Sequence, residues 1–267
     1  MAQRIETTDL RGVLRTPPDD RWELLRWAPA PALAPYAEFF WTVLWDLRGA
    51  EPHRQITLPY PAAHLVVEHG EAHIYGPSSR RFERVLAGAG RVTSVRFTPG
   101  GLRPLLAVAM STIADRVLGA GLVPGLDERA LARAVEGEPD PDRATAVLED
   151  AVLAVLPAEP DPAVDEAARA VALLSADRSL TRVADLADGM GLSVRSLQRL
   201  FAEYVGLGPA WVIRRFRLHE AAAQATAGGE VDWARLATEL GYYDQAHLVR
   251  EFTATIGTPP ARYAAGS

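Results

Sequence analysis

The last third of this 267-residue chain contains one spaced pattern twice, the second copy about fifty residues after the first. The first copy is Leu186-Ala187-x3-Gly191 followed by Leu197-x-Arg199-x-Phe201-x4-Gly206-x2-Pro209, and the second is Leu236-Ala237-x3-Gly241 followed by Leu248-x-Arg250-x-Phe252-x4-Gly257-x2-Pro260. Glycine and proline at these places end helices, so each copy predicts a short helix, a turn, a second helix and a stop. This is the outline of a helix-turn-helix, present twice.

Small polar residues stand where these helices are expected to begin. Ser193 and Asp244 precede the second helix of each copy, and Thr181 and Asp232 precede the first. A side-chain oxygen at such a position accepts hydrogen bonds from the free backbone N–H groups of the first turn. We therefore predict a side-chain cap at all four helix starts.

Each second helix has an apolar stripe and an opposite polar face. The stripes are formed by Leu197, Leu200, Phe201 and Tyr204 in the first copy and by Leu248, Phe252 and Ile256 in the second. The opposite faces carry Arg195, Gln198 and Arg199, and Gln245, Ala246, Val249 and Arg250. An arginine alone on such a face is more often simply solvated, but its recurrence in the duplicated pattern favours a function. Arginine matches the guanine edge and glutamine the adenine edge in the major groove, so these helices predict contact with DNA.

The duplicated region resembles the DNA-binding domain of AraC/XylS-type transcriptional regulators. The resemblance covers Ala163 to Tyr263 and is carried by Leu-Ala-x3-Gly-Leu-Ser193-x-Arg195-x-Leu-Gln198-Arg199-x-Phe and by Leu-Gly-Tyr-Tyr-Asp244-Gln-Ala-His-Leu-x-Arg250-x-Phe. It implies an all-α double helix-turn-helix domain of seven helices, in which a connecting helix at about Ala210 to Thr226 holds two recognition helices. These helices would enter successive major-groove segments about 34 Å apart.

The resemblance also assigns residues to the DNA contact. The positions that match the two recognition helices are Val194, Arg195, Gln198 and Arg199, and Gln245, Ala246, Val249 and Arg250. Ala246 and Val249 are apolar where polar residues are common, so the second helix is expected to anchor on phosphate or contact thymine methyl groups. Arg215, on the connecting helix, is expected to contact phosphate.

The charge balance does not favour DNA binding by itself. The formal net charge is −6, and the stretch from Ser175 onward contains ten arginines and ten carboxylates. A neutral domain binds DNA only if its arginines gather on one face. An interaction adaptor whose helix-turn-helix pair no longer recognises DNA therefore stays an alternative.

Composition excludes several other classes. The chain has no cysteine, which excludes disulfides, thiolate metal sites and cysteine nucleophiles, and with them the DNA-repair methyltransferases that carry a similar module. No apolar run approaches a membrane span and no signal peptide is visible, so we expect a cytoplasmic protein without membrane contact. We expect no cofactor, no catalytic residues and no enzyme activity, because no nucleophile elbow, Walker loop or dinucleotide fingerprint is present. An enzyme with a DNA-targeting appendage stays a second alternative.

Prolines 157, 160 and 162 mark a domain boundary, so we expect an N-terminal domain over residues 1–157 and the helix-turn-helix domain over 163–267. The front part predicts an α+β domain with a small antiparallel sheet or barrel plus helices. Its expected strands are Glu38–Leu47, Gln55–Leu58, His64–Glu68, Ala72–Tyr75, Arg81–Leu86 and Arg91–Phe97. Its expected helices lie near Leu102–Val108, Ile113–Val117, Asp127–Glu136 and Asp142–Val155, and Ala163–Leu174 opens the tail. The family resemblance implies that such a front domain senses a small molecule or dimerises.

Two residue groups in the front part are candidate binding sites. His64, Glu68, His69 and His73 resemble a cupin-like metal set, but strand alternation would split them between faces, so no metal site is predicted. Eight aromatic residues between Trp22 and Tyr60 form either plain core or the lining of an apolar pocket. For a pocket, the candidate ligand-binding residues are Trp41, Trp45 and Tyr60. Besides duplex DNA, the partners that we expect are a small-molecule effector, RNA polymerase and a second copy in a homodimer.

Overall fold

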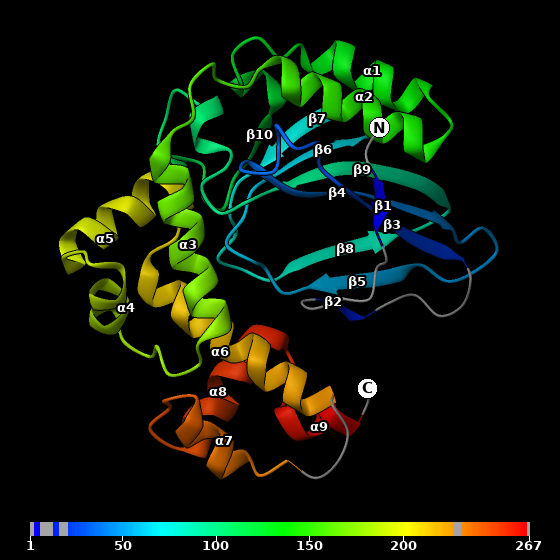
Figure 1. The fold of residues 1–267 in the computed structure, drawn as a ribbon. Helices are drawn as coiled ribbons and strands as arrows, with labels where there is room; N and C mark the ends of the chain where they lie inside the picture. Colours follow the sequence, from blue (N-terminus) through cyan, green and yellow to red (C-terminus); the bar gives the residue numbers. More distant parts are fainter. Residues whose placement is uncertain (1–2, 6–12, 16–20, 227–230, 266–267) are drawn as a thin grey trace. The chain divides into compact units, whose positions relative to one another are not determined.

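A computed structural model describes residues 3–5, 13–15, 21–226 and 231–265 (Figure 1). Contacts divide the chain into two compact units. The first comprises Met1–Ala168 and Leu200–Leu207, and the second comprises Arg169–Arg199 and Gly208–Ser267. The predicted domain limits at residues 157 and 163 stay a prediction.

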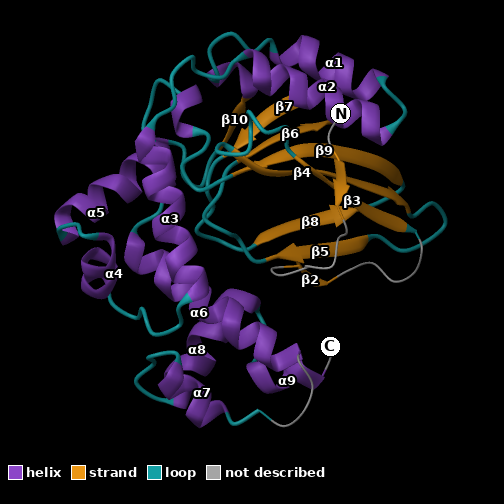
Figure 2. Cartoon of the chain, in the orientation of Figure 1, coloured by secondary structure: helices purple, strands orange, loops and turns teal. Residues whose placement is uncertain are grey.

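The first unit contains two antiparallel sheets (Figure 2). The larger sheet has the strand order β1(Gln3–Ile5), β3(Trp22–Ala28), β4(Ala37–Asp46), β9(Ala89–Phe97), β6(His64–Glu68), β7(Glu71–Tyr75) and β10(Val117–Gly119). The smaller sheet has the order β2(Val13–Arg15), β5(His53–Thr57) and β8(Phe82–Leu86). The expected α+β fold is confirmed, and all six predicted strands are present with ends shifted by at most two residues.

The first half of the chain also differs from the sequence prediction. β3 was not expected, because Trp22–Ala28 does not alternate apolar and polar residues. The helix predicted at Ile113–Val117 is wrong: a 3-10 turn, η2(Met110–Thr112), precedes it and Val117 begins β10. The helix predicted at Leu102–Val108 is only a 3-10 turn, η1(Arg103–Leu105), and a third such turn is η3(Ala120–Leu122).

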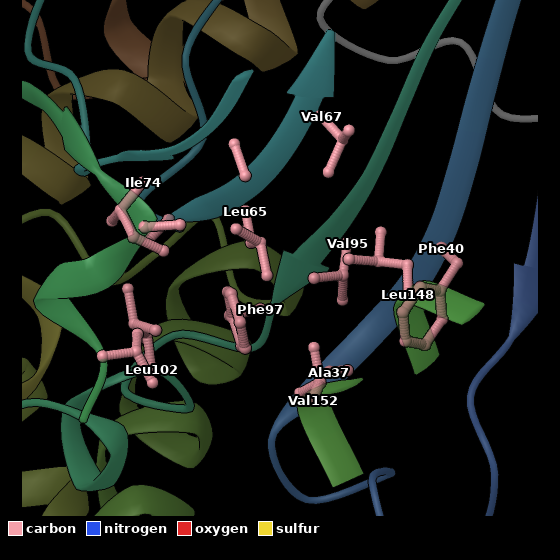
Figure 3. Packing of buried hydrophobic residues seen from close by; sticks show 14 of the residues in the cluster. Ala37, Phe40, Leu65, Val67, Ile74, Val95, Phe97, Leu102, Leu148 and Val152 are labelled. Atoms are coloured by element: carbon pink, nitrogen blue, oxygen red, sulfur yellow. The ribbon is translucent and has the colours of Figure 1, made fainter. Parts of the chain in front are cut away.

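The main core of this unit lies between the larger sheet and helices α1(Glu128–Gly137) and α2(Pro141–Ala154). Alternation along β4 and β9 directs Phe40 and Val95 to the helix side, where both are 0% exposed. Figure 3 shows these side chains in one cluster with residues of β6 and α2. Each fully buried side chain of this size contributes about 1.5–3 kcal/mol.

The other face of the larger sheet carries a smaller apolar cluster, formed by Trp45, Leu47, Val66, Leu86 and Val92. Leu86 comes from β8, so the cluster joins the two sheets. An ion pair between Arg84 of β8 and Glu68 of β6 joins them as well.

The segment Leu200–Leu207 belongs to this first unit although the residues on either side of it belong to the second. It contains a π-helical turn, η4(Phe201–Val205). Glu203 accepts a hydrogen bond from Arg103 Nε at 2.7 Å, and the Tyr204 hydroxyl donates to Asp161 at 2.6 Å. Burial, followed by this hydrogen bond, raises the pKa of Tyr204 to about 12, so the hydroxyl keeps its proton.

Candidate nucleic-acid interface

The second unit is helical and contains the duplicated pattern. Its helices are the last part of α3(Pro162–Ala176), α4(Val183–Met190), α5(Val194–Leu200) up to residue 199, α6(Pro209–Thr226), α7(Trp233–Glu239), α8(Gln245–Ile256) and α9(Pro260–Ala265). The pairs α4/α5 and α7/α8 are the two predicted helix-turn-helix motifs. Their turns contain Gly191 and Gly241, with φ of 68° and 70°.

Three of the four expected side-chain caps are present. Ser193 Oγ accepts from the Ser196 N–H at 3.1 Å, and Asp244 accepts from the His247 N–H at 2.7 Å. Asp232 caps α7 through the N–H groups of its second and third residues. The prediction for Thr181 is wrong, because the residue before α4 is Arg182, which makes no side-chain cap.

On α5, the apolar stripe and the predicted DNA-contacting face separate as expected. Leu197 is 0% exposed, whereas Val194, Arg195, Gln198 and Arg199 are all exposed. The predicted residues therefore lie together on the surface of this helix.

α8 repeats the arrangement. Leu248, Phe252 and Ile256 are buried, and the predicted residues Gln245, Ala246, Val249 and Arg250 are exposed except for Val249, which is partly buried. Within the described ranges, no ion pair or hydrogen bond occupies the guanidinium of Arg250, nor those of Arg195 and Arg199 on α5. These charged groups are thus available to an external acceptor.

Arg215 is not part of this surface, which corrects the expected phosphate contact. It is only 5% exposed, and its guanidinium lies 4.7 Å from the centroid of the Trp211 ring. Burial lowers the pKa of Arg215 to about 10, which leaves the side chain protonated at neutral pH. The carboxylate of Glu251 on α8 favours the charged form of this buried guanidinium.

Arg217, also on α6, touches both helix-turn-helix motifs. Its Nη2 donates to the carbonyl of Thr181, just before α4, at 2.5 Å. Its guanidinium lies 5.9 Å from the centroid of Tyr242, in the turn before α8. A Cβ at Gly241 would approach the Thr181 side chain to 3.0 Å and Arg217 Nη2 to 3.4 Å. These residues form a contact point, hereafter the Arg217 junction, that fixes one motif against the other.

Tyr243 is a surface residue that the sequence interpretation did not single out. It is 93% exposed and directly precedes the Asp244 cap of α8. The signal available in the sequence was an aromatic residue outside the apolar stripe, beside a recognition helix.

The predicted ligand-binding residues lie in the first unit on one face of the larger sheet. Trp41 and Trp45 are four residues apart on β4 and so point to the same side. The guanidinium of Arg96, on β9, lies 3.9 Å from the centroid of the Tyr60 ring. Arg96 pairs in register with His64 of β6, and the His64 ring meets the Trp41 ring edge to face. The structure therefore brings Trp41 and Tyr60 into one neighbourhood through Arg96 and His64.

The described residues meet neither the requirements of a metal-binding cluster nor those of a membrane-spanning helix. It holds no group of three or more His, Cys, Asp or Glu residues placed to bind a metal ion. Over the same residues, no helix combines the length and the apolar character needed to cross a bilayer.

Two helix-turn-helix motifs with exposed arginine on each second helix define a DNA-binding class of domain. Residues 186–266 match the family model described as helix-turn-helix domain, and residues 25–119 match a domain of unknown function (DUF6597). A protein of Streptomyces lividans described as an AraC-like transcription regulator is 36% identical over 81 residues, which are 30% of this chain and 26% of that protein. The C-terminal part of this chain is a helix-turn-helix domain, similar to part of that AraC-like transcription regulator. The chain matches only about a quarter of the length of that relative.

Solved structures of similar proteins include a transcriptional regulator with an AraC-type DNA-binding domain from Chromobacterium violaceum. It is 24% identical, covers 39% of this chain and 90% of its own, and has a TM-score of 0.34. ToxT from Vibrio cholerae is 12% identical over 91% of this chain and 97% of its own, with a TM-score of 0.42.

Proposed function

We propose that this protein is a sequence-specific transcriptional regulator that inserts α5 and α8 into successive major-groove segments of duplex DNA. The observation that carries the proposal is the exposed polar face on both helices, each opposite a buried apolar stripe. Arg199 and Arg250 occupy equivalent positions in the two copies and have no competing partner within the described ranges. Each can therefore present two parallel donors to guanine O6 and N7.

The remaining contacts divide by chemistry. Arg195, Gln198 and Gln245 are exposed and supply further donors for base edges or phosphate. Val194 and Ala246 are exposed apolar residues suited to thymine methyl groups. The overall neutrality of this region, ten arginines against ten carboxylates from Ser175 onward, predicts modest nonspecific affinity.

For the first unit, we propose effector sensing through the sheet face that carries Trp41, Trp45 and Tyr60. Solvent reaches part of Trp41 and Tyr60, so these aromatic surfaces are open to a small molecule. Dimerisation and contact with RNA polymerase stay predictions from the family resemblance.

Selection from a randomised duplex library, followed by fluorescence anisotropy on the selected site, tests the DNA role. We expect Arg199→Ala and Arg250→Ala each to weaken specific binding by about 1–3 kcal/mol and to relax the preference at one base position. Arg129→Ala, an exposed arginine in α1, is the matched control for loss of one positive charge. Failure to select any sequence, or equal effects of all three substitutions, would favour the adaptor alternative.

A further inference from the structure

The face of the larger sheet that meets the three-stranded sheet combines aromatic and polar side chains. Alternation from Trp41 and Trp45 on β4 and from Val66 on β6 places His64 and Glu68 on this face. From the opposite sheet, Phe82 contacts Tyr75 with ring centroids 6.3 Å apart. These residues lie between the two sheets rather than in the helix-covered core.

Several side chains on this face are less completely buried than those of the core on the other side of the sheet. On the helix side, Phe40 and Val95 are 0% exposed. On the side of the three-stranded sheet, Trp22, Trp41 and Val43 keep partial exposure although they pack against the apolar cluster. Solvent therefore touches part of the Trp22 and Trp41 side chains, and a ligand that displaces this solvent gains apolar contact.

Two ion pairs lie in this region, and the guanidinium of Arg26, which pairs in register with Trp41, lies 4.6 Å from the centroid of the Phe39 ring. Arg84 binds Glu68, and the Tyr75 hydroxyl donates to the same carboxylate at 3.2 Å. Arg96 binds Glu38 at 2.9 Å. Because these formal charges are already compensated, a charged ligand would have to break an existing pair to gain a partner. The arrangement favours a ligand without net charge.

Two histidine nitrogens of this region have no hydrogen-bond partner within the described ranges. They are His64 Nδ1 and His53 Nε2, both buried. Burial, with a smaller effect from Arg96, lowers the pKa of His64 to about 3, so its imidazole is neutral and offers one donor and one acceptor. A buried polar group without a partner costs free energy, which a bound hydroxyl or N–H group would recover. The His64 ring also meets Trp41 edge to face, with centroids 6.1 Å apart.

We infer that the first unit binds an uncharged, planar aromatic molecule with a hydroxyl or ring N–H group, held against Trp41 and hydrogen-bonded to His64. The inference rests on the proposed sensing role and names the chemical class of its effector. Trp41 supplies the stacking surface, and His64 distinguishes a hydroxylated ring from a bare hydrocarbon. The compensated ion pairs disfavour carboxylates and amines.

Four small probes test this inference on the full-length protein: phenol, toluene, benzoate and cyclohexanol, titrated by calorimetry and tryptophan fluorescence. We expect saturable binding of phenol, with affinity at least tenfold higher than for benzoate or cyclohexanol and about tenfold higher than for toluene. This ranking needs no substitution and so does not depend on whether a variant folds. Binding of benzoate in preference to phenol, or no saturable binding of any probe, would overturn the inference.

Two substitutions locate the site. His64→Phe keeps an aromatic ring but removes both nitrogens, so we expect a tenfold loss of phenol affinity with toluene affinity changed by less than twofold. Trp41→Ala should weaken both ligands, and Trp211→Phe, in the second unit, should weaken neither. If phenol affinity is the same in His64→Phe and Trp41→Ala as in the unchanged protein, the site lies elsewhere and the inference fails.

DNA binding without ligand is measured separately on the selected duplex. Loss of sequence-specific DNA binding with retained phenol binding rejects the regulator role but keeps the ligand class. The reverse result keeps the regulator role and rejects the ligand class.

Discussion

The Arg217 junction can be tested by Arg217→Met, which keeps most of the aliphatic stem and removes the guanidinium. The substitution eliminates the hydrogen bond to the Thr181 carbonyl, which the structure gives as 2.5 Å and partly buried. A hydrogen bond from a charged donor contributes about 1.5–3 kcal/mol, and a cation–π contact at the 5.9 Å seen with Tyr242 adds about 0.5 kcal/mol or less. Partial solvent access reduces the sum, so we expect a loss of about 2 kcal/mol in the free energy of unfolding.

The loss should be confined to the second unit. Urea unfolding followed by far-ultraviolet circular dichroism gives the change in free energy, and hydrogen exchange measured by mass spectrometry shows where protection falls. Exchange should increase near Thr181 and Gly241, while β4 and β9 stay protected. Since the junction fixes one motif against the other, the affinity for a duplex long enough to contact both motifs should also fall. The affinity for a shorter duplex that contacts only one motif should fall less.

The matched control is Arg235→Met. Arg235 also forms a polar contact, with Glu239 at 2.7 Å, but its side chain is 77% exposed. Water screens an exposed pair of this spacing, so its loss should change the free energy of unfolding only slightly. Equal changes in the two variants, or no change in Arg217→Met, would refute the assignment of the junction.

Three further predictions address other residues. Arg215→Ala should lower the free energy of unfolding by more than about 2 kcal/mol, because it leaves a cavity beside Trp211. The salt dependence of DNA binding should stay the same, whereas a weaker salt dependence would show that Arg215 contacts phosphate after all. Gly241→Ala should destabilise the second unit by about 1 kcal/mol or more, since φ is 70° and the new Cβ would lie 3.0 Å from Thr181; a thermal melt that matches the unchanged protein would contradict this. Burial holds the pKa of His64 at about 3, below its unfolded value of 6.5, so its stabilisation is complete above pH 6.5 and is lost as the pH falls toward 3. Between pH 7 and pH 5 the loss should be about 2 kcal/mol and should be absent from His64→Phe, as paired urea titrations at the two pH values would show.

Sequence patterns predicted those elements in which the local residue pattern and the packing of the folded chain favour the same secondary structure. The six expected strands alternate or carry β-branched residues between glycines, and packing on one face uses the same alternation. The recognition helices likewise combine a polar cap, a three- and four-residue apolar period and a glycine stop. These patterns located the exposed faces of α5 and α8 without knowledge of their neighbours.

The remaining features depend on contacts between distant residues. Arg214, Arg215 and Arg217 are near neighbours in one helix, and nothing local shows that Arg215 is buried beside Trp211 while Arg214 is exposed. Thr181 has the side chain of a cap, but the chain turns so that its carbonyl meets Arg217 instead. The spacing of apolar residues along the sequence does not reveal such contacts.

The placement of Leu200–Leu207 has a practical consequence for dissecting this protein. A fragment that begins at the proline-rich stretch near residue 160 would contain both recognition helices but would lack Arg103 and Met110. Glu203 would then lose its partner, and Gly206, where a Cβ would approach the Met110 carbonyl to 2.9 Å, would lose the surface against which it lies. An excised tail is therefore expected to fray immediately after Arg199, and a weakly binding fragment would reflect this missing support rather than a defect in base recognition.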